Sequence, residues 1–127
     1  MSEITFYRCE KCGNLVALIN KGGGTLTCCD QPMKKLEPNT TDAATEKHVP
    51  AITKENGKIE VAIGSVLHPM LPEHHIEWIA LYTGKRLEFK YLKPGEDPKA
   101  EFEDADSGTV YEYWIFMGFG RLNFNII

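Results

Sequence analysis

The feature that most constrains this fold is the placement of its four cysteines, which form one C-x-x-C pair and one C-C pair near the start of the chain. They are Cys9, Cys12, Cys28 and Cys29. A C-x-x-C pair followed at a distance by a second pair is typical of a tetrahedral site in which four thiolates hold one metal ion. A disulfide between the adjacent Cys28 and Cys29 would be strained, so we favour a metal site. Thiolate ligands alone do not distinguish zinc from iron.

The segment around the cysteines is too short to bury much apolar surface. It reads FYRCEKCGNLVALINKGGGTLTCCDQPMKKLEP, with three glycines at residues 22–24 between the apolar runs LVALI and TLT. These two runs predict a small hairpin. We expect a bound metal ion to supply much of the folding free energy of so small a module. Gly13 can relax the backbone after Cys12, whereas adjacent cysteines need a distorted turn to reach one ion.

The pattern then changes to short strands separated by turns. The strand-like runs include KIEVAIG, HIEWIALYTG, RLEFKYLKPGEDP, KAEFED and TVYEYWIFMGF. Most of them end at Gly, Pro or Asp, and this spacing predicts an antiparallel sandwich or barrel. We therefore expect an all-β chain with a metal module over residues 1–37, a polar linker over residues 38–47 and a β-sandwich over residues 48–127. We take TVYEYWIFMGF as its last strand.

Charge and hydropathy argue against several classes of partner. The 127 residues carry a net charge of −4 with both signs interspersed, which argues against nucleic acid as the main partner. No run approaches the roughly 18 apolar residues that span a bilayer. The first residues have neither the basic start nor the apolar stretch of a signal peptide. We therefore expect a cytoplasmic protein with no membrane partner, and disulfides are rare in that compartment.

Four histidines in the second part of the chain are candidates for a second metal site. They are His48, His68, His74 and His75, each beside a proline or at the end of an expected strand. Imidazoles at the loop tips of a rigid sandwich are well placed to share one metal ion. A lone histidine is more often structural or exposed. A Ser/His/Asp hydrolase is a weaker alternative, because no nucleophile-elbow signature occurs.

Several motifs together resemble the desulfoferrodoxins, the class of superoxide reductase with two iron centres. YRCEKCGNLV and CCDQPMK resemble the desulforedoxin-like iron module of that family. TDAATEKHVPAI, VAIGSVLHPM, PEHHIEWIALY and YLKPGEDPKAEF resemble its catalytic domain. The resemblance runs in order from Phe6 to Tyr113. It implies a small desulforedoxin-like module followed by an immunoglobulin-like antiparallel β-sandwich.

The resemblance implies two iron centres. The four cysteines would hold the first iron, an electron-transfer or structural centre. His48, His68 and His74 would be equatorial imidazole ligands of the catalytic iron. In the family, a fourth imidazole and an axial thiolate come from a C-x-x-H motif near the C-terminus. His75 is interpreted as a neighbour of this site.

The implied activity is the one-electron reduction of superoxide to hydrogen peroxide at a ferrous non-haem iron, a detoxification reaction in oxidative stress. Lys47 resembles the family lysine that attracts the anion and helps to supply a proton, and Glu46 matches the family glutamate that can close the open iron position. Without the resemblance, this Glu-Lys pair would be interpreted as solvated surface. Each turnover consumes an electron, which implies a donor such as rubredoxin. The two-centre members of the family are homodimers.

The C-terminal segment departs from the family pattern. The family ending EYC-x-x-HG falls on residues 112–118, where Trp114 takes the cysteine position and Met117 the histidine position. An indole does not ligate iron, and a thioether is a weak, soft ligand. We therefore expect the second iron to be weakly bound or absent and the activity to be impaired. The alternative is a non-catalytic electron-transfer protein that uses only the four-cysteine centre.

Three explanations of this departure remain open. The chain has diverged to a three-histidine site with other chemistry, or it has kept only the first iron, or its reading frame has shifted. Restoring one base within the codon of Trp114 gives, with permitted codons, the ending YCDIHGFWKA followed by a stop. The residues NFNII would then be read-through beyond the true end. We favour a one-base deletion, and the codons of the gene would test it.

Overall fold

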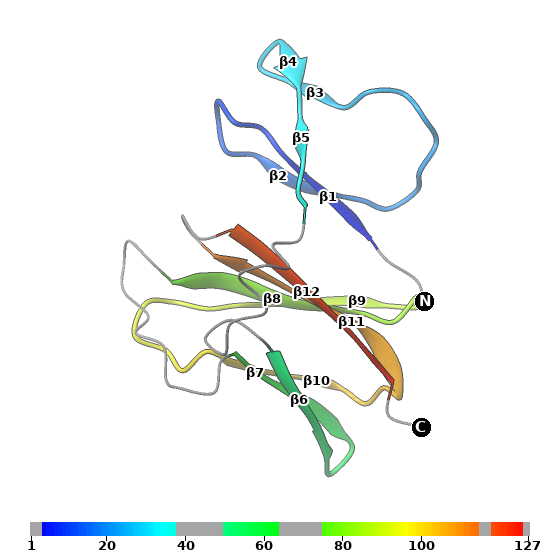
Figure 1. Cartoon of the computed structure of the whole chain (residues 1–127), viewed down its shortest axis with the longest axis vertical. Helices are drawn as coiled ribbons and strands as arrows, with labels where there is room; N and C mark the ends of the chain where they lie inside the picture. The colour runs from blue at the N-terminus through cyan, green and yellow to red at the C-terminus, as the bar shows by residue number, and fades with distance from the viewer. Residues whose placement is uncertain (1–3, 38–49, 64–74, 115–117, 126–127) are drawn as a thin grey trace. The chain divides into compact units, whose positions relative to one another are not determined.

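The described part of the chain is built entirely from β-strands in two units. The computed structural model describes residues 4–37, 50–63, 75–114 and 118–125. Every regular element in these ranges is a strand (Figure 1). The smaller unit is Glu3–Glu37, and the larger one comprises Met1–Ser2 and Pro38–Ile127. No described segment forms a helix with the length and apolar character needed to cross a membrane.

The smaller unit consists of five short strands in two antiparallel sheets. They are β1 (Thr5–Arg8), β2 (Leu15–Leu18), β3 (Thr27–Cys28), β4 (Gln31–Pro32) and β5 (Lys34–Lys35). One sheet has the order β2-β1-β5, and the other pairs β3 with β4. The predicted hairpin between LVALI and TLT is therefore wrong: LVALI pairs with β1, where Leu15 lies opposite Arg8. The physical reason is that the C-x-x-C segment itself forms the tight turn between these two strands.

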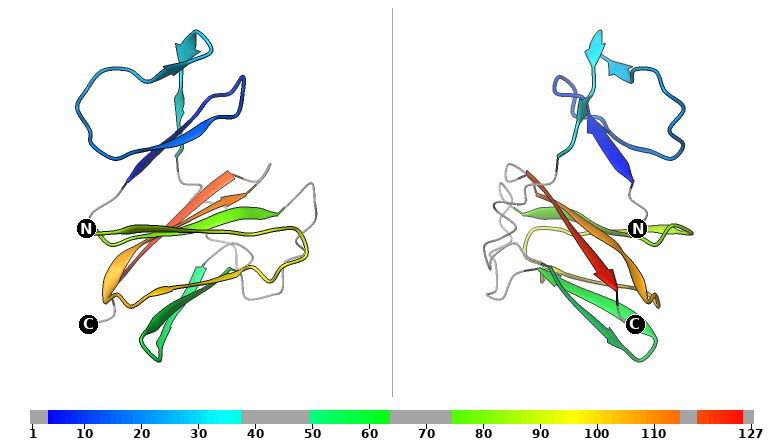
Figure 2. Two further views of the ribbon diagram at one scale, coloured as in Figure 1. Left: turned by 180° about the vertical axis from the view of Figure 1, so that it is seen from behind. Right: turned by 45° about the vertical axis from the view of Figure 1, so that its right-hand side comes forward.

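The larger unit consists of two antiparallel sheets. One has the order β10-β7-β6 and the other β12-β11-β8-β9. The strands are β6 (Pro50–Glu55), β7 (Lys58–Ile63), β8 (Ile76–Tyr82), β9 (Leu87–Tyr91), β10 (Lys99–Glu103), β11 (Ser107–Trp114) and β12 (Gly118–Asn125). Figure 2 shows the two sheets as separate layers from two further sides.

Apolar side chains from both sheets form one core between the layers. Along β7, Ile59, Val61 and Ile63 are buried and alternate with more exposed residues. They share a cluster with residues of the other sheet, among them Leu81 and Val110. Two sheets that pack inner face to inner face make a β-sandwich. The predicted fold class, a small module followed by an antiparallel β-sandwich, is confirmed.

The last strand of the fold differs from the expected one. The run TVYEYWIFMGF does not form a single final strand, because β11 ends at Trp114 and the chain returns as β12. The two strands pair without interruption, from Trp114 opposite Gly118 to Ser107 opposite Asn125. Thr109 donates a side-chain hydrogen bond of 2.8 Å to the Oδ1 atom of Asn123. The segment that contains NFN is therefore an edge strand that completes the four-stranded sheet.

Candidate metal centre

The first cysteine pair lies on a tight turn that follows β1. The backbone N–H of Cys9 donates to the carbonyl oxygen of Asn14, and the N–H of Gly13 donates to the carbonyl oxygen of Cys9, both at 2.8 Å. Gly13 has a φ of 84°, a left-handed conformation in which a side chain is unfavourable. Because these hydrogen bonds close the backbone into a tight turn, the side chains of Cys9 and Cys12 lie close to each other. The glycine after Cys12 thus has the relaxing role expected from the sequence.

The second cysteine pair lies on a two-residue hairpin turn. Cys28 is the last residue of β3, Gln31 is the first of β4, and the two lie opposite each other. The turn residues between them, Cys29 and Asp30, have φ values of 53° and 61°. Positive φ at both central residues is the conformation of a type I′ turn, which matches the twist of the flanking strands. The distorted turn that adjacent cysteines need is therefore a left-handed turn without a glycine.

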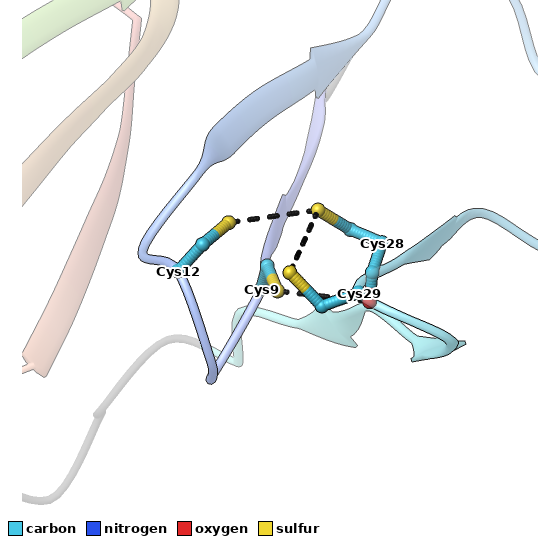
Figure 3. A group of neighbouring side chains, drawn as sticks. All are labelled: Cys9, Cys12, Cys28 and Cys29. Atoms are coloured by element: carbon cyan, nitrogen blue, oxygen red, sulfur yellow. Dashed lines mark hydrogen bonds between the residues drawn. The ribbon is translucent and has the colours of Figure 1, made fainter.

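The four sulfur atoms converge on one point. All four Sγ atoms lie within 4.8 Å of one another. Figure 3 shows the four side chains pointing toward one another. The Sγ–Sγ distance is 3.6 Å between Cys12 and Cys28 and 4.0 Å between Cys28 and Cys29. A tetrahedral ion with metal–sulfur bonds of about 2.3 Å requires sulfur atoms about 3.8 Å apart. The cluster therefore fits a four-thiolate ion such as iron or zinc.

The thiols of this cluster do not ionise alike. The backbone N–H of Cys12 lowers the pKa of Cys9 to about 6. The hydrogen bond with the Cys12 side chain is the main cause that raises the pKa of Cys28 and raises that of Cys29 to about 12. At neutral pH the cluster therefore carries a thiolate at Cys9, while Cys28 and Cys29 keep their protons. A bound cation would displace these protons and compensate the charge of the thiolates.

The cluster is open to solvent on one side. Cys9 is buried with 1% of its surface exposed. Cys12 and Cys29 are exposed, and Cys28 is half-buried. A centre with two exposed cysteine residues lies near the surface of its unit, where a redox partner can approach it.

The described residues also reveal a contact that the sequence analysis missed. The side-chain Nδ2 of Asn14 donates a hydrogen bond of 3.7 Å to the sulfur of Cys28. Asn14 lies two residues after Cys12, in the same turn, and Cys28 follows 14 residues later. In the sequence, only the proximity of Asn14 to the first cysteine pair suggested a role for this residue. That proximity did not indicate which sulfur atom its side chain would contact.

The predicted second centre falls largely outside the described residues. This applies to Glu46, Lys47, His48, His68, His74 and Met117, and to the side chain of Trp114. The neighbouring strands are described: β6 begins two residues after His48, and β8 begins two residues after His74. Trp114 ends β11 and pairs with Ile76 at the start of β8. His75, directly before β8, is buried with 7% of its surface exposed. The histidine ligands remain a prediction.

Comparison with known proteins gives a consistent result for both units. A family model for the desulfoferrodoxin N-terminal domain matches residues 2–36, and one for desulfoferrodoxin matches residues 40–113. The desulfoferrodoxin of Clostridium acetobutylicum is 50% identical over 112 residues, which are 88% of this chain and 90% of that protein. A desulfoferrodoxin homolog of Archaeoglobus fulgidus is 51% identical over 115 residues, covering 87% and 92% of the two chains.

A solved structure agrees with these sequence relatives. The superoxide reductase from Treponema pallidum matches with a TM-score of 0.74 and 25% identity, over 94% of this chain and 97% of that one. The second family model covers more than half of this chain and stops at Tyr113, one residue before the departure at Trp114. By this match and by its sequence relatives, the chain belongs to the desulfoferrodoxin family.

Proposed function

We propose that this chain is a superoxide reductase with an intact four-cysteine iron centre and an incomplete catalytic centre. The observation that carries the proposal is the family match over residues 40–113 combined with the convergence of the four sulfur atoms. Superoxide is the substrate, and one electron and two protons convert it to hydrogen peroxide. Ferrous iron, when bound at the catalytic centre, would supply that electron.

The roles of the chain's own residues follow from the family resemblance. We propose that the imidazoles of His48, His68 and His74 bind the catalytic iron. Lys47 attracts the superoxide anion, since a cation near the mouth of a site raises the local concentration of anions. Glu46 would supply a carboxylate ligand to the iron in its resting ferric state. The starts of β6 and β8, each two residues beyond a predicted ligand, are consistent with ligands held at the ends of a rigid sandwich.

The activity of the chain as written is expected to be low. Trp114 supplies no thiolate and Met117 no imidazole, so iron binding weakens and the electron donation of the thiolate is lost. The test compares this chain with a variant carrying both Trp114→Cys and Met117→His. We expect about one iron per chain without the changes and about two with them, with superoxide-dependent oxidation in stopped-flow absorbance only in the variant. Equal iron content and equal rates in the two proteins would contradict the proposal.

A second candidate is an electron-transfer protein that uses only the four-cysteine centre. The observation that favours it is the exposure of Cys12 and Cys29 at an otherwise complete ligand set. This candidate predicts one iron per chain, reversible reduction of that iron, and no reaction with superoxide even after the double change. The same pair of proteins therefore distinguishes the two candidates.

Two observations bear on the origin of the C-terminal segment, and they favour different explanations. The family match ends at Tyr113, which supports a one-base deletion after that residue. The uninterrupted pairing of β12 with β11 supports a segment adapted to the sheet. The codons of residues 114–123 decide between them, because a deletion requires that restoring one base yields the cysteine, the histidine and the stop.

The assembly and the partners complete the proposal. We propose a cytoplasmic homodimer that receives electrons from a rubredoxin-like donor. We also propose that residues 1–37 form the metal module, residues 38–47 a linker and residues 48–127 the catalytic sandwich. Sedimentation equilibrium tests the dimer, and the rate of reduction by purified rubredoxin tests the donor.

A further inference from the structure

Asn14 connects the two cysteine pairs of the metal module. Its backbone carbonyl accepts the N–H of Cys9 at 2.8 Å, which fixes Asn14 within the first cysteine turn. From this position its side-chain Nδ2 donates to the Cys28 sulfur at 3.7 Å. Cys28 is itself central to the cluster, with the sulfurs of Cys12 and Cys29 at 3.6 and 4.0 Å. Among the described residues, Asn14 is the non-cysteine residue whose side chain donates a hydrogen bond to a cluster sulfur.

A hydrogen bond to a metal-bound sulfur has a different effect on the two oxidation states of iron. When four thiolates hold the ion, the ferrous form carries one more negative charge than the ferric form. An N–H directed at a sulfur stabilises the more negative form more strongly, so it favours reduction. Hydrogen bonds to the sulfurs are among the factors that set the potential of iron–thiolate centres.

We propose that Asn14 raises the reduction potential of the four-cysteine iron centre through its side-chain hydrogen bond to Cys28. The inference rests on the proposed binding of iron at this centre. Asn14 acts as a positioning residue, because it touches a ligand rather than the ion. This hydrogen bond makes the iron centre easier to reduce and thereby affects which electron donors can reduce it.

The test uses the full chain loaded with iron and two substitutions at Asn14. Asn14→Leu removes the N–H with little change in size, and Asn14→Asp replaces the donor by a negative carboxylate. The matched controls are Asn20→Leu and Asn20→Asp, because Asn20 is an exposed asparagine of the same module and no described bond connects it to a cluster sulfur. Spectroelectrochemistry on the visible thiolate-to-iron absorption measures the ferric-to-ferrous ratio in each protein.

We expect Asn14→Leu to raise the ferric-to-ferrous ratio at a fixed potential by about threefold to tenfold, where tenfold corresponds to 59 mV for one electron. Asn14→Asp should raise it further, and both Asn20 variants should leave it unchanged. If the iron spectrum is intact and Asn14→Leu changes the ratio less than about twofold, the proposal is wrong. If neither the parent chain nor any variant shows a thiolate-to-iron absorption spectrum, the proposed binding of iron at this centre is wrong.

A second measurement does not depend on any variant folding correctly. The parent chain is loaded with the NMR-active isotope cadmium-113, and scalar coupling is measured between the metal and the side-chain amide protons of Asn14. A resolved coupling is expected, because it passes through the N–H···S hydrogen bond. If the coupling is absent while backbone amides of the cysteine turns show one, the hydrogen bond is not made and the proposal is overturned.

Discussion

The left-handed turn at Cys29 and Asp30 gives the sharpest prediction for the metal module. Asp30 has a φ of 61°, and aspartate tolerates this region because its short side chain can bond locally. Valine does not, since a β-branched residue at positive φ is a genuine outlier. Asp30→Val therefore keeps all four ligands and changes only the ease with which the turn brings Cys28 and Cys29 together.

The magnitude follows from the backbone conformation. An ordinary residue with a Cβ loses roughly 1–2 kcal/mol in the left-handed region, a cost that aspartate offsets by local side-chain bonding and valine does not. Because folding of so small a module and metal binding are one equilibrium, that strain reduces the apparent metal affinity. With tenfold per 1.4 kcal/mol, the expected loss is about 5- to 30-fold. Asp30→Gly removes the strain instead, so its affinity should equal or exceed that of the parent chain.

The assay is a competition titration of the full chain against a chromophoric chelator of known affinity, with zinc as the metal. The matched control is Asn56→Val, because Asn56 has a φ of 53° in the two-residue turn between β6 and β7. That change should destabilise the sandwich in urea without altering the affinity of the four-cysteine site. If Asp30→Val binds zinc within about twofold of the parent chain, the link between turn strain and affinity is refuted.

Three further predictions concern pH, metal removal and the core. Binding at neutral pH displaces protons from Cys28 and Cys29, whose pKa values are raised, so affinity should fall at least about 100-fold per pH unit on acidification. The fall should steepen below the pKa of Cys9, about 6, because binding then displaces one more proton. Titrations from pH 8 to 5 measure both slopes. Chelation of the metal should remove amide-exchange protection from residues 4–37, and retained protection there would contradict a metal-dependent fold. Phe102→Ala, at a side chain 2% exposed in the sandwich core, should cost about 3–5 kcal/mol of unfolding free energy in urea.

Local signals in the sequence predicted much of this protein. The spacing of the four cysteines indicated a four-thiolate site because a C-x-x-C turn and a second pair supply ligands in a fixed local geometry. The alternation in KIEVAIG predicted a half-buried strand, and Ile59, Val61 and Ile63 are indeed buried along β7. These features depend on residues close together in the chain, so a local pattern is sufficient to find them.

Only the tertiary structure decided which segments pair and which side chains meet. The run LVALI has the periodicity of a strand, but nothing in it specifies β1 rather than TLT as its partner. The apolar run TVYEYWIFMGF looked like one strand, yet it is divided between the paired strands β11 and β12. Asn14 reaches the sulfur of Cys28 only because two separate turns converge on the metal cluster. Strand periodicity determines which face of a strand is buried, whereas its partner depends on how distant parts of the chain close together.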